Sequence, residues 1–516
     1  MTLDSTSLAA AVGTSVKNVQ FKPAADNLPR KILIVGTYDP TKTAVVDDVP
    51  VLITSPEDAG DRFGFGSMIH RLAVQVFLGS NGVETWVIPQ AEISGADQAT
   101  GSIAFTASQA LAGTLRFYVA GIAVPVVITA GMTGAQVATA VAAAVTANAD
   151  LPVSAVATDD DVAFTAKSAG PWGNFITLAF NIQTGEEYPS GVSAVVSAMS
   201  SGAGTPDIST ALDALGTGDS ANEAWFTELV HGYGLVSDVL DAISTYVGAG
   251  NDFIGLYDKL VARPFRSLTG DTVVGSGGLS ALLVISGNRK LDRANGVISV
   301  PGSKSHPSEI AAQAMGYMAR VNNDRAAQHY IGAVLQGVDP GAKADRWTNS
   351  YDSRDTAVKG GVSPTRVIGS AVVLQNVVSF YRPVNVPVSS NGYRSMRNIS
   401  ILQNILYNVD LNFEQEKWQG ISIVQDSARV SSAIDRQKVR DIGAVIDELI
   451  ALAKAFEGKG WIYTADFTIA HLKVAGAVSI RTGTTGFDST MKVILSGEGA
   501  ILDTMVEFDT SIAALM

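Results

Sequence analysis

The stretch that decides the fold begins with KILIVG (residues 31–36) and ends with VETWVIP (residues 83–89). KILIVG is a short continuous apolar run closed by a glycine, which is typical of a buried strand. Between the two runs, VPVLITS (49–55) predicts a second strand, and MIHRLAVQVFL (68–78) repeats apolar side chains at helical spacing. Residues 31–90 therefore predict an α/β unit.

A segment of different composition follows, from about residue 93 to residue 204. Residues 101–182 contain only six charged side chains. The segment TGAQVATAVAAAV (133–145) predicts a helix. Six short segments alternate like strands: GSIAFTA, TLRFYVA, VPVVIT, VSAVAT, VAFTAK and FITLAFNI. We interpret residues 93–204 as a small α+β domain inserted in a loop of the larger one, flanked by the Gly/Ser/Ala-rich SAVVSAMSSGAGTPD (193–207).

The α/β pattern resumes after about residue 205. AWFTELVH (224–231) and the apolar run SALLVIS (280–286) predict strands, and LVSDVLDAISTYV (235–247) predicts a helix. PSEIAAQAMGYMARV (307–321) predicts a further helix, with Ser308 as its N-cap residue.

The last part of the chain predicts one long helix and then strands. IDRQKVRDIGAVIDELIALAKAFEGKG (434–460) contains apolar residues that step by three and four, with Gly458 where a helix stop belongs. GWIYTADFTIA (460–470), MKVILSG (491–497) and ILDTMVEFDTSIAALM (501–516) predict strands.

The closing strand has one apolar side, formed by Leu502, Thr504, Val506 and Phe508. A single strand cannot satisfy its own backbone groups. It therefore either folds back onto its own domain or pairs with an exposed sheet edge of another molecule. The pattern alone leaves both possibilities open.

The opposite end of the chain carries a weaker strand signal. In SVKNVQF (15–21), Val19 and Phe21 share a face, within an otherwise loose arm that ends at NLPR (27–30). Both ends of the chain thus have features suited to strand exchange between copies.

Length, cysteine content, net charge and apolar runs limit the classes of protein to which this chain could belong. At 516 residues, roughly three domains are expected. The chain has no cysteine, which removes disulfides and thiolate chemistry. A net charge of -13 disfavours general nucleic-acid binding, because the phosphate backbone is also negatively charged. The opening MTLDSTSLAA lacks the features of a signal peptide, and the longest apolar run, VAGIAVPVVITAGM (119–132), is too short to span a bilayer. These features predict a soluble, unprocessed protein.

Charged side chains are scarce for a free monomer. They make up 16% of the chain, whereas apolar residues make up 47%. Large contact areas with other proteins would explain this balance, and a large multidomain core is the alternative explanation.

No convincing catalytic or metal-binding pattern is present. The five histidines lack metal-ligand spacing on a shared helix face. Ser303, Ser305 and His306 cluster in GSKSHPSE, but adjacent Ser–His pairs point their side chains apart, so a polar loop before a helix is the simpler interpretation. GSGG (275–278) lacks the Lys-Ser/Thr of a phosphate loop and is interpreted as a turn, and the DDD run (159–161) lacks further spaced carboxylates for a cation site. We predict no catalytic, cofactor-binding or metal-binding residues.

The order of segments resembles the contractile-tail sheath proteins of bacteriophages, specifically the Mu-like kind. Four stretches carry the resemblance: RKILIVGTYD with VLITSPEDAGDRFGFGSMIHRLAVQVFLGSNGVETWVIPQAE; AGTLRFYVAGIAVPVVITAGMTGAQVATAVAAAV with FTAKSAGPWGNFITL; HPSEIAAQAMGYMA with NNDRAAQHYIGAVLQGV; and LSGEGAILDTMVEFDTSIA. Together they cover most of residues 30–335 and the end of the chain. The order of the motifs, rather than any single one, makes the resemblance specific.

The resemblance implies a structural, non-enzymatic protein without cofactors. Sheath subunits of this kind form a homo-oligomer of stacked six-fold rings around a tail tube protein, and neighbours exchange terminal arms to complete a shared sheet. The sheath shortens on infection and drives the tube through the host envelope. Further implied partners are baseplate and tail terminator proteins, with no direct nucleic-acid contact and no membrane insertion. The implied location is the virion tail, assembled in the host bacterial cytoplasm.

The fold class implied is α/β and α+β multidomain: a sheath-type α/β core with an inserted small, β-rich α+β domain, a C-terminal α+β domain and strand-exchanging terminal arms. The expected divisions are an N-terminal arm (1–28), a discontinuous main α/β domain (29–92 and 205–365), an inserted outer domain (93–204), a C-terminal tube-facing domain (366–496) and a C-terminal arm strand (497–516).

Shortening of such an assembly requires hinges between arms and domains. Pro29 is the candidate for the N-terminal arm, and Gly497 and Gly499 are the candidates for the C-terminal arm, because glycine absorbs large backbone changes. The inter-subunit strands would carry Val19 and Phe21 at one end and the apolar side of the closing strand at the other.

Two other functions remain open at this point. One is the sheath of a related contractile bacteriocin or secretion machine, whose mechanical part would be the same. The other is a hydrolase built on the α/β core, with Ser305 or His306 in its site. Such an enzyme would need an acidic partner that converges on these residues, together with a pocket.

Overall fold

The protein has a mixed α/β structure. The computed structural model describes residues 25–215, 226–248, 266–347, 350–383, 392–481 and 486–497. The chain divides into two compact units, which we call unit 1 (1–26 and 408–496) and unit 2 (27–407 and 497–516). The boundary at residues 407 and 408 falls within helix α10 (Met396–Phe413).

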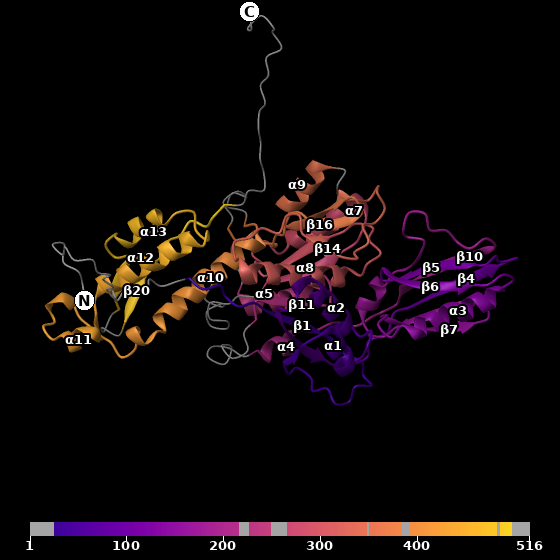
Figure 1. The fold of residues 1–516 in the computed structure, drawn as a ribbon, viewed down its shortest axis with the longest axis horizontal. Coiled ribbons are helices and arrows are strands. Elements are labelled where there is room, and N and C mark those ends of the chain that lie inside the picture. Colours follow the sequence, from indigo (N-terminus) through magenta and orange to yellow (C-terminus); the bar gives the residue numbers. More distant parts are fainter. Residues whose placement is uncertain are drawn as a thin grey trace, which may run out of the picture. The chain divides into compact units, whose positions relative to one another are not determined.

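Unit 2 is built on a nine-stranded sheet in the order β14-β16-β15-β13-β12-β11-β1-β3-β2 (Figure 1). The strands from β3 to β15 pair in parallel, whereas β2, β16 and β14 pair antiparallel at the two ends. Their bounds are β1 (Lys31–Thr37), β2 (Val51–Ile53), β3 (Glu84–Gln90), β11 (Glu228–His231), β12 (Arg266–Asp271), β13 (Asn295–Ser299), β14 (Val334–Leu335), β15 (Val362–Ile368) and β16 (Ala371–Leu374). The parallel strands are almost entirely buried, as expected when helices cover both faces of a sheet.

Two helices of this core cross at very short distance. They are α2 (Met68–Ser80) and α8 (Pro307–Asp324). A Cβ atom added at Gly79 would lie 2.3 Å from the carbonyl oxygen of Gln313, and one added at Gly316 would lie 2.5 Å from that of Val76. Glycine is therefore required at both positions for this close approach. The other core helices are α1 (Pro56–Phe63), α4 (Ser209–Asp213), α5 (Ser237–Val247), α7 (Gly275–Gly287) and α9 (Tyr351–Lys359).

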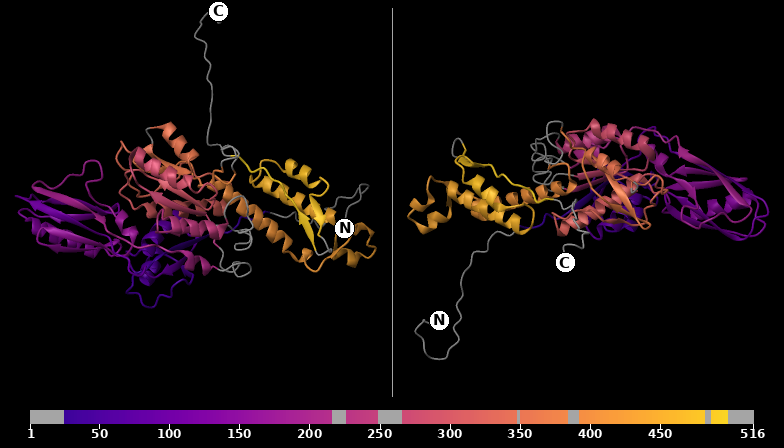
Figure 2. Two further views of the ribbon diagram at one scale, coloured as in Figure 1. Left: turned by 180° about the vertical axis from the view of Figure 1, so that it is seen from behind. Right: turned by 90° about the horizontal axis from the view of Figure 1, so that it is seen from above.

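Residues 100–200 form a separate body beside the nine-stranded sheet, within unit 2 (Figures 1 and 2). It contains a four-stranded sheet, β10-β4-β8-β7, a three-stranded sheet, β6-β5-β9, and helix α3 (Gly134–Ala147). The strands are β4 (Thr100–Ala107), β5 (Gly113–Val119), β6 (Ile122–Ile128), β7 (Val153–Thr158), β8 (Asp161–Ala166), β9 (Leu178–Phe180) and β10 (Val192–Ser200), with a 3-10 turn at Pro171–Phe175.

The chain enters and leaves this inserted body side by side. Asp97 and Ala203 form an antiparallel bridge, with N–H···O distances of 3.0 and 3.2 Å in the two directions. This bridge holds together the two connections to the core.

Unit 1 contains a smaller α/β arrangement. Its helices are α11 (Ala433–Gln437), α12 (Ile442–Gly458) and α13 (Ala465–Leu472), with 3-10 turns at Glu416–Trp418 and Ser427–Arg429. Two short two-stranded sheets pair β17 (Ser422–Ile423) with β18 (Val439–Arg440), and β19 (Val478–Ile480) with β20 (Phe487–Ser489). Helix α12 buries Leu449, Leu452 and Phe456 along one face.

Several predicted elements are confirmed. The unit at residues 31–90 contains the two flanking strands and the helix α2, and helix α3 begins at a capping box formed by Thr133 and Gln136. The helices predicted at 235–247 and within 434–460 are also present as α5 and α12.

Other predictions were wrong. SALLVIS (280–286) is not a strand but part of helix α7, and GSGG (275–278) is the start of that helix rather than a turn. Residues 278, 282 and 286 are buried, which is a helical period hidden in a continuous apolar run. SAVVSAMSSGAGTPD (193–207) was expected to flank the inserted domain, but its first half belongs to strand β10 of that body.

Three further corrections concern two predicted strands and one predicted helix cap. The predicted strand at 460–470 is mostly helix α13, which Thr464 caps by accepting from the Asp466 N–H at 3.2 Å. The predicted strand at 491–497 has a single bridge, at Leu495. Helix α8 is capped by His306 rather than Ser308, because Pro307 occupies its first turn.

Candidate functional site

The N-terminal segment is anchored in unit 2 from Asn27 onward. The Asn27 side chain donates to the carbonyl oxygen of Asp324 at 2.6 Å. The Leu28 N–H donates to Asn404 Oδ1 at 2.8 Å, and the Leu28 side chain is fully buried. The Arg30 N–H donates to Asn323 Oδ1 at 3.1 Å. Successive residues are thus bonded to helices α8 and α10 before β1 begins.

Arg30 itself belongs to a buried charged network. Its Nη1 lies 3.7 Å from Glu228 Oε1, and Glu228 also pairs closely with Arg266. Arg266 Nη1 donates to Tyr330 OH at 2.7 Å, while Arg30 Nη2 donates to Ser400 Oγ at 2.6 Å. The network joins the N-terminal segment to β11, β12 and α10. Removal of one charged member would leave another charge buried without compensation, which is strongly destabilising.

Burial dominates the electrostatics of this network. It lowers the pKa of Arg30 to about 10, with the Glu228 charge opposing the shift and the Arg266 charge adding to it. Both guanidinium groups are fully buried around a single carboxylate. The network therefore fixes the chain here but offers no exposed group for chemistry.

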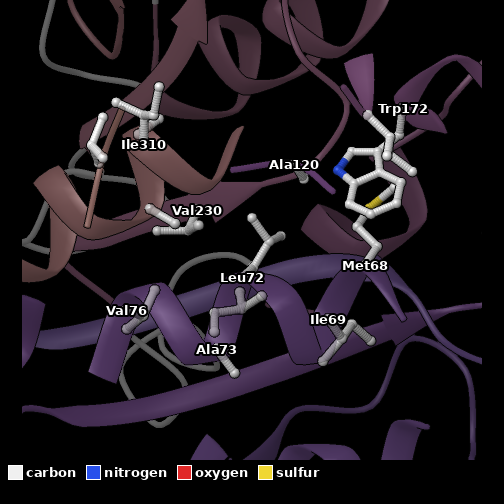
Figure 3. Close-up of a cluster of buried hydrophobic side chains, with 14 of the residues drawn as sticks. Met68, Ile69, Leu72, Ala73, Val76, Ala120, Trp172, Val230 and Ile310 are labelled. Atoms are coloured by element: carbon white, nitrogen blue, oxygen red, sulfur yellow. The ribbon is translucent and has the colours of Figure 1, made fainter. Parts of the chain in front are cut away.

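The inserted body is joined to the core through apolar packing and polar bonds. Figure 3 shows Met68, Leu72 and Ile69 of α2 with Ala120 and Trp172 of the inserted body in one cluster. The Met68 N–H donates to Ser168 Oγ at 3.1 Å. The two bodies thus share one continuous hydrophobic core.

A buried ion pair lies under this junction. Arg71 Nη2 donates to Glu309 Oε2 at 2.7 Å and Arg71 Nε donates to Glu309 Oε1 at 3.0 Å, with both side chains 5% exposed. Arg71 Nη1 also reaches the carbonyl oxygen of Asp150 in the inserted body, at 3.4 Å. Burial alone would lower the pKa of Arg71, but Glu309 raises it overall. The guanidinium links α2, α8 and the inserted body.

Ser305 and His306, the residues of the alternative hydrolase hypothesis, lie at this junction. His306 Nε2 lies 3.1 Å from the carbonyl oxygen of Trp172, and His306 Nδ1 accepts from the Ser308 N–H at 3.3 Å. Ser305 Oγ accepts from the Asp339 N–H at 3.0 Å. Burial lowers the pKa of His306. Both ring nitrogens are thus engaged with backbone groups, and this arrangement does not give Ser305 a general base.

A small cavity lies at the carboxyl ends of β11 and β12, where ligands of α/β sheets commonly bind. Its volume is about 230 Å³, and its lining includes Trp172, Phe175 and Asp271. Burial raises the pKa of Asp271 to about 6, and its Oδ2 accepts from the Val273 N–H at 3.2 Å. The lining is mainly apolar and supplies no nucleophile with a base.

In the part of the chain that the structure describes, no group of three or more His, Cys, Asp or Glu residues could hold a metal ion. Within the same residues, no helix is both long enough and apolar enough to cross a membrane.

The C-terminal segment is anchored in unit 1 up to Ser496. The Tyr463 N–H donates to the carbonyl oxygen of Ile494 at 2.7 Å, and the Ser496 N–H donates to that of Trp461 at 3.0 Å. Tyr463 is 74% exposed and Ile494 43% exposed. These backbone bonds hold the chain as far as Ser496, one residue before the described segment ends at Gly497.

No family model matches the chain. Among curated proteins, the chain is 25% identical over 440 residues to the "Mu-like prophage FluMu tail sheath protein" of Haemophilus influenzae, and the alignment covers 84% of each chain. The chain is similar to a tail sheath protein over most of its length. At this coverage the relationship includes the α/β core and the inserted body rather than a single shared module.

Two solved structures that are similar to this chain are a sheath tail protein and a sheath complex. The sheath tail protein of Desulfitobacterium hafniense has 10% identity, covers 87% of this chain and 90% of its own, and gives a TM-score of 0.41. A PVC sheath complex in the contracted state has 8% identity over 99% and 100% of the two chains, with a TM-score of 0.46. Because these TM-scores are below 0.5, the identification rests on the sequence relative.

Two of the predicted arm residues lie in described segments of the chain. Pro29 is exposed, between the buried residues Leu28 and Arg30. Gly497 is exposed, and a Cβ atom there would meet nothing within 4 Å. The other predicted arm residues lie outside the described residues: Val19, Phe21, Gly499, Leu502, Thr504, Val506 and Phe508.

The sequence prediction missed the residues that anchor the terminal segments. The network of Arg30, Glu228 and Arg266 joins positions far apart in the chain, and only its unusual charges within apolar strand segments could have indicated it. The open edges of the inserted sheet were also missed. On these edges Val195 of β10 is 72% exposed and Val156 of β7 is 65% exposed.

Proposed function

We propose that this chain is the structural subunit of a contractile tail sheath. Copies would stack as six-fold rings around a tail tube protein, and the assembly would shorten to drive the tube through the host envelope. The observation that carries the proposal is the 440-residue relationship to the Mu-like prophage tail sheath protein. Baseplate and tail terminator proteins would be the partners at the two ends, and the assembled sheath would be part of the virion tail.

Exchange of terminal strands would join neighbouring copies. Backbone hydrogen bonds supply affinity with little dependence on sequence, and alternating side chains such as Val506 and Phe508 would fix the register. An open, repeating assembly needs an interface in which one surface meets a different surface on the next copy. A strand donated from one end to a sheet edge elsewhere meets this requirement.

The anchors of the terminal segments support this role. A strand held by a neighbour transmits load to the residues that fix it in its own subunit. At the N-terminal side these are Leu28 and Arg30, bonded to α8 and α10, and at the C-terminal side Ser496, bonded to Trp461. Each anchor lies close to the terminal segment that would be exchanged.

The inserted body would form the outer domain of the sheath, and the C-terminal region would face the tube. The proposed divisions are those expected from the sequence: 1–28, 29–92 with 205–365, 93–204, 366–496 and 497–516. The shared hydrophobic core and the Arg71–Glu309 pair support movement of the inserted body and the α/β core as one rigid element.

Gly497 is the better supported of the proposed hinges. It is exposed, with free space around it, and no side chain restricts its backbone. Both neighbours of Pro29 are buried and bonded through their backbone N–H groups, which limits the bending available at that position.

Truncation tests the proposal. Removal of residues from 499 onward should leave a folded subunit, because the described cores remain, but should abolish striated tubes seen by negative-stain electron microscopy. A matched control removes only residues from 511 onward, beyond the predicted anchors, and should still form tubes. Normal tubes from the longer truncation would contradict strand donation, and absence of rings or tubes from the intact chain with a tail tube protein would contradict the sheath function itself.

A further inference from the structure

The cavity at the carboxyl ends of β11 and β12 has the features of a ligand site that the sheath function does not use. Its lining comes from the ends of these two strands, from helix α7, from the start of helix α8 and from the 3-10 turn Pro171–Phe175 of the inserted body, all within unit 2. Ligand pockets of α/β proteins form at this end of a parallel sheet, and most are apolar with a few polar groups that orient the ligand. The cavity has both properties.

Asp271 supplies the charge of this cavity. Among the described residues that line it, Asp271 is the only charged one, and it is 9% exposed. Its Oδ2 atom accepts from the Val273 N–H at 3.2 Å and lies 3.5 Å from Ser299 Oγ. Its Oδ1 atom receives no hydrogen bond from the described residues and is not fully enclosed.

The Asp271 carboxylate is also without a compensating positive charge in the described part of the chain. Burial raises its pKa to about 6, which still leaves the group ionised at neutral pH. An ionised group in an apolar environment is unfavourable unless a charge of the opposite sign pairs with it. The cavity therefore favours a cationic ligand.

The other walls favour an apolar body on that ligand. The lining includes Trp172 and Phe175 from the inserted body, and Leu282 and Ile285 from α7. The Trp172 ring contacts the ring of His306, with the two centroids 4.6 Å apart. The volume of the cavity is about 230 Å³, and an apolar cavity of about 150 Å³ is large enough for benzene. One aromatic ring with a short charged arm therefore fits.

The hydrogen bonds of the carboxylate select among the possible cations. A metal ion needs several oxygen ligands, and the described residues contain no group of three or more His, Cys, Asp or Glu that could hold one. A guanidinium group binds a carboxylate best through both of its oxygens, but Oδ2 of Asp271 is already engaged by Val273. An ammonium group is a compact charge that needs only one acceptor. The free Oδ1 atom matches this group.

We propose that this cavity binds a small organic molecule that carries a primary ammonium group on an apolar body. The ammonium group would donate to Asp271 Oδ1, and the body would lie against Trp172, Phe175 and Leu282. Because the lining comes from both the core and the inserted body, a bound ligand would stabilise the junction between them. This ligand site goes beyond the sheath function and does not depend on it.

Ligand-detected NMR on the intact, unassembled chain tests the site. The charged probe is benzylammonium, whose single ring and single ammonium group match the cavity, and the neutral probe is benzyl alcohol. Saturable binding of benzylammonium is expected, with a Kd about tenfold lower than that of benzyl alcohol, because a hydrogen bond to a charged partner is stronger than a neutral one.

Asp271→Asn keeps the shape of the side chain and removes its charge. It should raise the Kd of benzylammonium about tenfold and leave that of benzyl alcohol unchanged. The matched control is Asp159→Asn, which makes the same change at an exposed turn between β7 and β8 and should have no effect. If circular dichroism shows that Asp271→Asn does not fold, Ala281→Phe replaces it. Ala281 lines the cavity but is exposed, so the larger ring should block both probes without disturbing the core.

Absence of saturable benzylammonium binding to the wild-type chain would overturn the proposal. Equal Kd values for the two probes, unchanged binding in Asp271→Asn, or unchanged binding in Ala281→Phe would overturn it as well. Binding that weakens as the protein concentration rises would assign the cavity to a basic side chain of a second copy, and would also overturn the small-molecule assignment. None of these measurements requires tubes, so they succeed or fail separately from the sheath function.

Discussion

The close crossing of α2 and α8 predicts a large effect of one methyl group. In Gly316→Ala, the new Cβ atom would lie 2.5 Å from the Val76 carbonyl oxygen and 3.0 Å from the Ser80 N atom. Both are backbone atoms of another helix, which no side-chain rotation can move. The helices would have to separate at a crossing that buries part of the main hydrophobic core.

The expected magnitude follows from two opposing terms. Overpacking of a core is unfavourable by about 1–3 kcal/mol, and rigid backbone obstacles place this case near the upper value. Replacing glycine by alanine within a helix is favourable by up to about 1 kcal/mol. Gly316→Ala should therefore lower the free energy of unfolding by about 2 kcal/mol.

Urea unfolding followed by circular dichroism provides the measurement. The matched control is Gly458→Ala at the end of α12, where a Cβ atom would meet nothing within 4 Å. The control makes the same chemical change without the obstacle, so it should be neutral or slightly stabilising. A Gly316→Ala protein as stable as the control would refute the claim that the glycines are required for the crossing.

Three further predictions concern buried charge and the closing strand. Burial lowers the pKa of His231 to about 4, so the unfolded chain takes up a proton first as the pH falls below about 6.5. The wild type should therefore lose about 3 kcal/mol more than His231→Leu as the pH falls from about 6.5 to about 4, and a pH-independent difference between their urea midpoints would contradict this. Glu309→Gln leaves the Arg71 charge buried without compensation, so it should lower the free energy of unfolding by about 3–5 kcal/mol in the same assay. The double variant Glu309→Gln with Arg71→Met should recover most of this loss. If the losses of the two single variants simply add, the two side chains are not energetically coupled and the prediction is wrong. Phe508→Asp should weaken tube assembly more than Asp509→Ala, because only the former puts a charge on the predicted apolar side; equal assembly by light scattering would reject the register.

The sequence predicts elements well where local signals agree. KILIVG and the helix at 68–78 were predictable because period, length and flanking residues indicate the same structure, and the same holds for α3 with its capping box. The strand predicted at SALLVIS was wrong because its five consecutive apolar residues, ALLVI, show no visible period. Helix α1 was missed although Ser55 and Pro56 form a recognisable helix start.

The anchoring sites are less accessible to sequence analysis. Arg30 meets Glu228, and Leu28 meets Asn404, across long separations in the sequence, which reach 376 residues for the second pair. Local propensity contains no information about such contacts, because the charged and amide side chains of Arg30, Glu228 and Asn404 would each favour solvent on their own. The resemblance to tail sheath proteins, which the sequence relative supports, did not point to these residues.

The continuous core beneath Met68 and Trp172 has a consequence for how such proteins diversify (Figure 3). A module with its own sealed core can be gained, lost or exchanged by a single recombination event. Here, excision of residues 93–204 would remove the Ser168 partner of the Met68 N–H and leave Arg71 without its contact to Asp150. A viable exchange between relatives must therefore replace the inserted body together with the matching face of α2, so the two should be inherited as one block.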